Sequence, residues 1–282
     1  MRFMNKKSNN KRIIPGFRLS LGVTVSILSI VVLIPICSLI VYSAKLSPTE
    51  FFEIVTRKRA LASYGVSLLT SFLAAIVNAV MGVIIAWVLV RYDFPGKKVM
   101  DGMIELPFAL PTAVAGIALT HLCVPEGWIG KFFGVFGIDV AYTKFGITIA
   151  LIFIGIPFVV RSIQPVLERV EPDYEEAASI MGANRIQIFF KVIVPEIIPA
   201  LVAGFTMAFA RGLGEYGSVV FIAGNMPYKT EITPLLIMTE LEEFDYASAT
   251  AIALMMLLIA FVILFINAIL QSFTSKVVSG LE

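Results

Sequence analysis

The sequence contains little charge: Asp, Glu, Lys and Arg make up only 15% of its 282 residues, against about 25% in ordinary soluble domains. Hydrophobic residues account for 58% of the chain. A soluble fold of this length cannot hide that much apolar surface, because folded chains still leave a large surface for polar groups to cover. The composition therefore excludes a soluble enzyme, a disordered chain and a secreted disulfide scaffold.

Cysteine, histidine and net charge are also scarce, and each shortage removes a class of function. The two cysteines, Cys37 and Cys123, lie far apart in apolar stretches, so they form neither a disulfide framework nor a metal-binding spacing. The single histidine, His121, has no partner in view for metal binding or for base chemistry. The net charge of +2 provides no basic field for nucleic acid, so we expect no nucleic-acid partner.

Patterns for ATP binding and catalysis are missing as well. Gly96-Lys97-Lys98 lacks the upstream glycine and the following hydroxyl residue of a phosphate-binding loop. No H-E-x-x-H pattern occurs, and the few ionisable residues in apolar stretches form no nucleophile–base set. We therefore expect no cofactor, no metal and no enzymatic activity in this chain, which excludes an intramembrane enzyme.

Long apolar runs are what the sequence does have. Six of them are long enough for a helix that crosses a bilayer, which takes about 20 residues, and none alternates like a barrel strand. The first run is about 24 residues long, which exceeds the 7–15 residues of the apolar region of a signal peptide. We therefore interpret it as a transmembrane helix. The sequence thus predicts an all-α integral membrane protein with six transmembrane helices. The runs are Leu19–Tyr42, Ser63–Val90, Gly102–Leu122, Phe145–Pro165, Ile197–Ile222 and Ala247–Leu270.

The distribution of Lys and Arg predicts the orientation. With the N-terminus inside, fourteen of these residues fall on the cytoplasmic side and seven outside, as the positive-inside rule requires. Residues 1–18 then form a basic cytoplasmic tail before the first transmembrane helix, residues 19–42, and both termini are cytoplasmic. The basic cluster Arg57–Arg59, which would lie outside, is the one feature that opposes this orientation.

Two outer loops carry patterns of their own. Ser47-Pro48-Thr49-Glu50 is typical of a helix start, with proline in the first turn and a capping box. The helix that follows either lies on the membrane surface or packs over the end of the bundle. The last outer loop, Met226–Tyr246, is rich in Asp and Glu, and we interpret it as a solvated charge run.

The loop between the fourth and fifth runs, residues 166–195, begins with a pattern for a short helix. Asp173 is expected to cap this helix, with Glu176 at the capping-box position and Glu175 in the first turn, where the helix dipole favours anions. Ala177 and Ala178 offer a small face that another protein can approach closely. The helix is either a docking knob or an ordinary connecting or re-entrant segment.

A second short helix is predicted after a glycine. Gly182 is placed to end the first helix in a left-handed conformation. Asn184 and Gln187 can then cap the second helix, and Pro195 is expected to end it.

Glu176-Ala177-Ala178, then Gly182 and a hydrophobic stretch ending in Pro195, resembles the EAA motif of ABC importer permeases of the MetI-like (type I) family. Val192 and Val194 depart mildly from its usual Ile and Leu. The resemblance implies a MetI-like permease domain over residues 63–270. It also implies that Glu175, Glu176, Ala177, Ala178 and Gly182 couple the chain to a separate ATPase, which uses the ATP.

A narrower resemblance concerns Arg91–Lys97, Leu106–Leu119 and Gly214–Asn225. These stretches are similar to the sulfate and molybdate permease branch, and Tyr216 and Ser218 favour the CysT-type sulfate/thiosulfate permeases. The resemblance implies import of sulfate or thiosulfate across the plasma (inner) membrane, with molybdate and tungstate left open. The implied partners are an ABC ATPase dimer, a second permease of the CysW type, a sulfate-binding protein and membrane lipid.

Charged residues inside the fifth run are candidates for the translocation path. Arg211 and Glu215 are four residues apart, so a continuous helix places them on one face. Together with Gly214 and Tyr216 they either line or gate the pore, or form a structural ion pair. Elsewhere, Glu105 is expected near the inner interface, and Asn78 and Asn267 are expected to form hydrogen bonds between helices.

The sequence leaves one alternative from a different class. A secondary transporter without an ATPase would show an inverted repeat and a midplane site on broken helices. Inspection finds no repeat between the two halves, so the leading interpretation is the permease subunit of an ATP-driven importer.

Overall fold

The computed structural model describes residues 17–279, and every regular element in this range is helical. It contains six helical segments long and apolar enough to span a membrane, which confirms the predicted number. The expected basic tail lies outside the described residues except for its last two positions. The six segments are Leu19–Ser43, Lys58–Arg91, Thr112–Gly134, Lys144–Arg169, Arg185–Leu213 and Tyr246–Ile269.

The segments are built from fourteen α-helices and one π-helix within the described range. The α-helices are α1 (Phe17–Ser43), α2 (Pro48–Thr56), α3 (Lys58–Arg91), α4 (Lys97–Ile104), α5 (Leu106–Ala109), α6 (Thr112–Cys123), α7 (Trp128–Gly134), α8 (Lys144–Arg169), α9 (Pro172–Ile180), α10 (Arg185–Ile188), α11 (Val194–Leu213), α12 (Val219–Ile222), α13 (Thr233–Glu242) and α14 (Tyr246–Ser279), and the π-helix is Phe189–Ile193.

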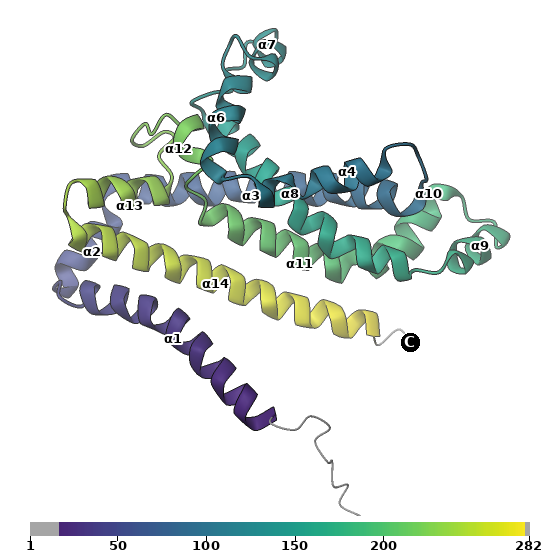
Figure 1. Cartoon of the computed structure of the whole chain (residues 1–282), viewed down its shortest axis with the longest axis horizontal. Helices are drawn as coiled ribbons and strands as arrows, with labels where there is room; N and C mark the ends of the chain where they lie inside the picture. Colours follow the sequence, from purple (N-terminus) through teal and green to yellow (C-terminus); the bar gives the residue numbers. More distant parts are fainter. Residues whose placement is uncertain (1–16, 280–282) are drawn as a thin grey trace, which may run out of the picture.

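Helices α3, α8 and α11 form the centre of the bundle, and α14 lies along α11 (Figure 1). Val159, Ile163 and Leu167 of α8 are completely buried against α3 and α11. A Cβ atom on Gly82 of α3 would lie 2.5 Å from the Val159 side chain. Small residues therefore let these helices approach closely. Such packing is usual in a membrane, where lipid chains are as apolar as the helices and the hydrophobic effect does not drive helices together.

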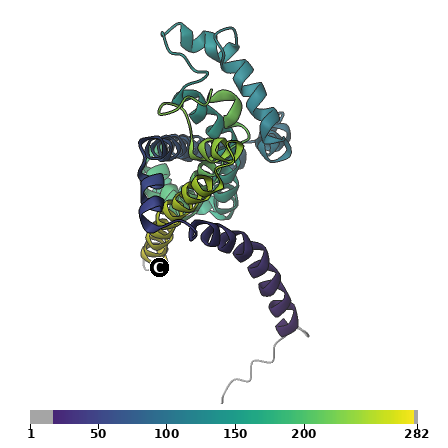
Figure 2. The same cartoon turned by 90° about the vertical axis from the view of Figure 1, so that its left-hand side faces the viewer.

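The first helix, α1, is separate from this centre. It contacts α14 and then runs away from the bundle on the side opposite α7 (Figures 1 and 2). The predicted surface helix follows as α2, and its capping box is confirmed: Glu50 accepts a hydrogen bond from the Ser47 backbone, and Ser47 accepts one from that of Glu50. Val55 of α2 is buried, so the helix packs over the bundle end through this side chain.

The third run, Gly102–Leu122, is predicted from Pro107 and Pro111 to be a distorted helix, and the structure breaks it completely and shifts its bounds. The chain there forms three separate helices, α4, α5 and α6, and the span of sufficient length runs instead over α6 and α7. Pro111 explains the break between α5 and α6, because proline disfavours the α conformation in the residue before it, and Leu110 is extended. Pro107 lies in the first turn of α5, where a helix needs no N–H donor. Helices α6 and α7 project away from the bundle (Figures 1 and 2).

The fifth span begins and ends earlier than predicted, at Arg185–Leu213. Helix α11 ends at Leu213, with Gly214 at its C-cap, and Val219–Ile222 forms a separate short helix, α12. The expected continuous helix over Ile197–Ile222 does not exist, so Arg211 and Glu215 are not two positions on one uninterrupted helix.

The acidic outer loop is not the solvated charge run that the sequence predicted. Glu231 is 1% exposed and accepts two hydrogen bonds from Arg59, at 2.9 and 2.7 Å. Glu240 is 3% exposed and forms an ion pair with Arg57. These pairs explain the basic cluster that opposed the predicted orientation, because its two arginines neutralise buried carboxylates of this chain.

One further prediction about polar groups in the spans needs correction. Asn78 is buried against Gly155, and neither side-chain atom has a hydrogen-bond partner in the described part of the chain. Asn267 lines an apolar groove with Phe205 and Phe209, and its hydrogen bond stays a prediction. Glu105 forms an ion pair with Arg161 of α8 at 2.8 Å, and its place near the inner interface stays a prediction.

Candidate functional site

The short helix predicted after residue 166 is present as α9, but it begins earlier than expected. Glu171 is the N-cap and Pro172 takes the first helical position, so Asp173 lies inside the first turn and does not cap the helix. Proline at the first position needs no N–H partner and already has a helical φ angle, which sets the start of the helix. Asp173 and Glu175 still lie where the dipole favours anions.

The turn after α9 confirms the predicted left-handed glycine. Gly182 has φ +87°, its N–H donates to the Ser179 carbonyl at 2.9 Å, and the N–H of Ala183 donates to the Ala178 carbonyl at 3.0 Å. This pair of bonds is the Schellman arrangement, which satisfies the last carbonyls of a helix. The turn fixes the direction in which the chain leaves α9.

The predicted cap of the second helix is also confirmed. Asn184 and Gln187 form a reciprocal capping box, with both hydrogen bonds at 2.9 Å. The prediction that Pro195 ends this helix is wrong: α10 continues through the π-helix Phe189–Ile193 into α11. The Val194 N–H donates to the Phe189 carbonyl across the π-turn, and Pro195 lies in the first turn of α11, where a helix tolerates proline.

One ion pair attaches α9 to the bundle. Glu175 lies 2.7 Å from the guanidinium of Arg91, at the end of α3, and Arg91 also donates to the Val170 carbonyl at 3.1 Å. The Arg91 guanidinium also lies over the Trp87 ring, with its carbon 5.7 Å from the ring centroid. The Trp87 ring packs edge-on against Phe189. Glu175 therefore faces this chain and holds α9, in place of pointing toward another protein.

The remaining residues of α9 divide into a buried and an exposed side. Ala178 is buried at 6% exposure, so it faces the bundle, whereas Glu176 and Ala177 are exposed. Ile180 and Met181, which the sequence analysis missed, are 86% and 82% exposed. Two large apolar residues on an otherwise polar cytoplasmic helix were the available signal. Exposed apolar side chains beside a rigid turn are typical of a protein-docking surface.

The second candidate site lies where α11 ends. Arg211 and Glu215 form an ion pair at 2.5 Å even though the helix stops between them. Glu215 is 1% exposed and also accepts hydrogen bonds from the backbone N–H and the hydroxyl of Ser218, at 2.9 and 3.0 Å. The Arg211 side chain is 35% exposed, and Tyr216 is 37% exposed. The carboxylate is therefore fully held by this chain, while part of the guanidinium stays open.

The loop after Arg211 is pressed against α6. A Cβ atom on Gly116 of α6 would lie 2.6 Å from the carbonyl oxygen of Ser218, and one on Gly217 would lie 2.1 Å from Thr112 Oγ1. The predicted pore residues Gly214 and Tyr216 belong to this loop. The loop that follows the Arg211–Glu215 ion pair therefore packs directly against α6 of the third span.

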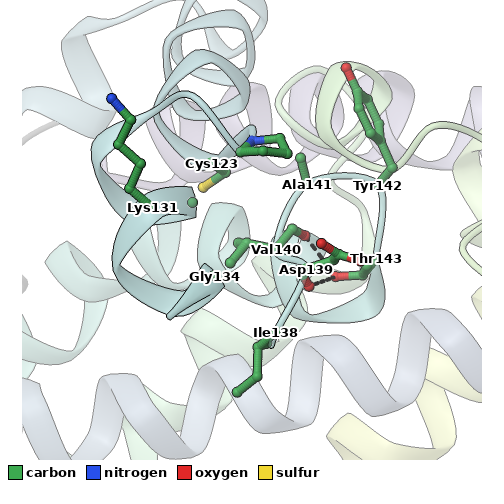
Figure 3. Close-up of a pocket in the computed structure, with 11 residues that line it drawn as sticks. Cys123, Lys131, Gly134, Ile138, Asp139, Val140, Ala141, Tyr142 and Thr143 are labelled. Atoms are coloured by element: carbon green, nitrogen blue, oxygen red, sulfur yellow. Dashed lines mark hydrogen bonds between the residues drawn. The ribbon is translucent and has the colours of Figure 1, made fainter. Parts of the chain in front are cut away.

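A cavity of about 630 Å³ lies beside α7, and no pattern in the sequence pointed to it (Figure 3). Its wall includes Cys123, Lys131, Asp139 and Tyr142. The Tyr142 N–H donates to the Ile222 carbonyl at 2.8 Å, which ties this region to α12.

The sequence of the chain is similar to that of a known protein family. Residues 78–276 match the family described as binding-protein-dependent transport system inner membrane component. The chain is 46% identical over 271 residues to the sulfate transport system permease protein CysT of Salmonella typhimurium, an alignment that covers 96% of this chain and 98% of that protein.

Solved structures show the same fold. A bacterial ABC transporter involved in the import of the acidic polysaccharide alginate has a chain that superimposes with a TM-score of 0.73 at 16% identity, covering 91% of this chain and 96% of that one. A second structure of the alginate transporter, in complex with its alginate pentasaccharide-bound periplasmic protein, gives a TM-score of 0.70 at 17% identity, covering 89% and 93%.

Proposed function

Since this chain belongs to the family of binding-protein-dependent transport system inner membrane components, we propose a function in the ATP-driven import of sulfate. The chain is a multi-pass protein of the plasma membrane and the permease subunit of a sulfate ABC importer. The observation that carries this conclusion is the 46% identity to a sulfate permease over 96% of the chain.

The coupling role belongs to α9 and the turn after it. Glu176, Ala177, Ile180 and Met181 face outward and supply the contact with an ATPase, while Glu175 and Ala178 fix the helix to its own bundle. Gly182 sets the angle at which the helix projects. A helix that is rigidly attached at one side and apolar at the other can transmit a displacement of the partner to α3 through Arg91.

ATP is used by the partner ATPase in this proposal, and the present chain contributes no nucleotide site and no cofactor. Its own sequence lacks the phosphate-binding loop. The ATPase and an extracytoplasmic binding protein are the partners that ABC importers of this fold require. A second permease subunit of the CysW type completes the path.

The anion path is proposed to pass Arg211, Gly214, Glu215 and Tyr216. A guanidinium has five N–H donors in a planar fork, so Arg211 can hold Glu215 on one side and meet an oxyanion on the other. Glu215 keeps the guanidinium in place and reduces the local net charge. That balance suits a site which must release a divalent anion as readily as it attracts it.

The test is ATP hydrolysis by the purified complex in vesicles. We expect the chain to co-purify with an ATPase and a second permease, and we expect sulfate-loaded binding protein to stimulate hydrolysis. Stimulation by molybdate or tungstate in place of sulfate and thiosulfate would assign the chain to the other substrate branch. Sulfate uptake that follows an ion gradient without ATP would contradict the proposal and favour a secondary transporter.

A further inference from the structure

Helix α7 and the turn after it are apolar on both sides. Ile129 and Phe133 pack inward against the cluster around Cys123 and Val140. A Cβ atom on Gly130 would lie 1.9 Å from the Val124 carbonyl oxygen, so the inward side is in tight contact with the end of α6. Apart from Lys131, the outward side of α7 is apolar as well, so it too needs to be covered by something other than water.

The outward side consists of large side chains that nothing in the described part of the chain covers. Trp128 is 84% exposed, Phe132 63%, Val135 83% and Phe136 66%. Trp128 and Phe132 are four residues apart in α7 and lie on one face of the helix, and Val135 and Phe136 follow directly after its last residue, Gly134. The Phe132 and Phe136 rings contact each other, with centroids 5.8 Å apart. We call these four residues the aromatic face.

We infer that the aromatic face is embedded in the membrane–water interface, with lipid as its partner. Tryptophan and other aromatic side chains concentrate at this depth, because a ring can be apolar at one end and wet at the other. Val114 and Ile117 of α6, in the same candidate span, are 51% and 55% exposed as well. Exposed apolar side chains along a candidate membrane span favour lipid over water as the partner, and the quenching test below distinguishes lipid from a separate protein.

Lys131 fits the same partner. It is the one charged residue of α7, it is exposed, and its side chain extends away from Asp139 and Thr143 (Figure 3). A lysine beside an apolar face can bury its alkyl stem and place its ammonium at the lipid phosphates. The ligand is therefore a phospholipid headgroup region, with the rings at the level of the glycerol and upper chains.

The anchor has a mechanical consequence. Gly116 of α6 contacts the Ser218 carbonyl, and Ser218 donates two hydrogen bonds to Glu215. An arm held by lipid at α7 thus fixes α6 against the loop that holds the Arg211–Glu215 pair. This inference concerns the lipid contact of α7 and is independent of which anion the chain carries.

The chain has two tryptophans, which makes the test direct. In this chain Trp87→Phe leaves only Trp128, and Trp128→Phe leaves only Trp87 as a matched control on the same scaffold. Tryptophans of the other subunits emit equally in every sample, so the signal from each position is its difference from the unmodified complex. The intact complex is placed in vesicles whose phospholipids carry bromine on the chains near the headgroup, and emission is compared with that in unbrominated vesicles. We expect Trp128 to lose most of its emission to the brominated lipid and to resist acrylamide, a quencher confined to water.

Unchanged Trp128 emission in brominated vesicles would overturn the inference. Strong acrylamide quenching would then show that the face is in water, and resistance to both quenchers would show that another protein subunit covers it. Because Trp87→Phe alters the neighbourhood of Arg91, the difference in quenching between the unmodified protein and Trp128→Phe provides the same measurement without that change. A further variant, Trp128→Asp, is expected to shift the face toward water and lower uptake, whereas Trp128→Phe retains it.

Discussion

The two ends of the bundle are built in opposite ways. At one end Arg57 and Arg59 form ion pairs with Glu240 and Glu231, and both carboxylates are almost completely buried. We call these four residues the closed end. The end at α9 and α10, which we call the open end, has one internal ion pair and leaves large apolar side chains exposed.

This difference between the two ends indicates how each end can meet other proteins. Charges at the closed end are neutralised within the chain, and a buried charge is tolerated only when it is paired. At the open end Ile180 and Met181 are exposed on a helix held by Glu175. The chain thus neutralises the buried charges of the closed end by itself, whereas at the open end it presents exposed apolar side chains of α9 to the ATPase of the proposed importer.

The largest expected effect comes from breaking a pair at the closed end. Arg59→Met leaves the Glu231 carboxylate buried without its cation, which is expected to lower the free energy of unfolding by about 3 kcal/mol. The measurement is the thermal unfolding midpoint in detergent. Lys58→Met is the matched control, because Lys58 is the exposed neighbour and is expected to change little. An equal shift in both variants would show that the pair contributes nothing specific.

The next largest effect concerns the turn at the open end. Gly182→Asp forces a side chain into φ +87° and is expected to cost about 1–2 kcal/mol in the turn. Because α9 then loses its direction, sulfate uptake should fall close to background while the protein still reaches the membrane. Gly182→Asn is the control, since Asn adds a side chain of the same shape without the negative charge that opposes the helix dipole at a C-terminus, and it should retain part of the uptake. Normal uptake by Gly182→Asp would remove the turn from the coupling mechanism.

The structure also shows which of these features could be predicted from the sequence alone. The Gly182 turn and the two capping boxes were predictable, because each depends on residues within four positions of one another. The burial of Glu231 was not, since its partner Arg59 is 172 residues away in the chain. Pro107 and Pro111 made a distortion of the third span predictable, but the full break there and the π-turn before Pro195 depend on the neighbouring turns, which spacing does not specify.

A smaller effect is expected from the exposed side of α9. Met181→Ser removes a contact without burying or exposing anything in the isolated chain, so the unfolding midpoint should not change. ATPase binding should weaken by about 1 kcal/mol, roughly fivefold. Co-purification at graded detergent or salt concentration measures it. A lowered unfolding midpoint with unchanged binding would mean that Met181 packs against its own chain.

The smallest effect belongs to the start of α14, at the closed end. The Asp245 carboxylate accepts the Ser248 N–H at 2.9 Å, and hydrogen bonding to Ser248 lowers the pKa of Asp245 below its ordinary value. A lowered pKa stabilises the fold above about pH 4, and this contribution is lost as the pH falls through the lowered value. Asp245→Ala should therefore cost below about 1 kcal/mol at pH 7 and nothing at low pH. A deficit that persists in acid would contradict this origin.

Crosslinking from position 181 tests most directly whether the open end receives the ATPase. In a background where Cys37 and Cys123 are replaced by alanine, Met181→Cys and Glu243→Cys are prepared in the assembled complex, the second as a probe beside the closed end. A short thiol-reactive crosslinker is then added to permeabilised membranes. The account predicts a covalent product with the ATPase from position 181 and none from position 243. The reverse pattern, or an ATPase product from both positions, would contradict it.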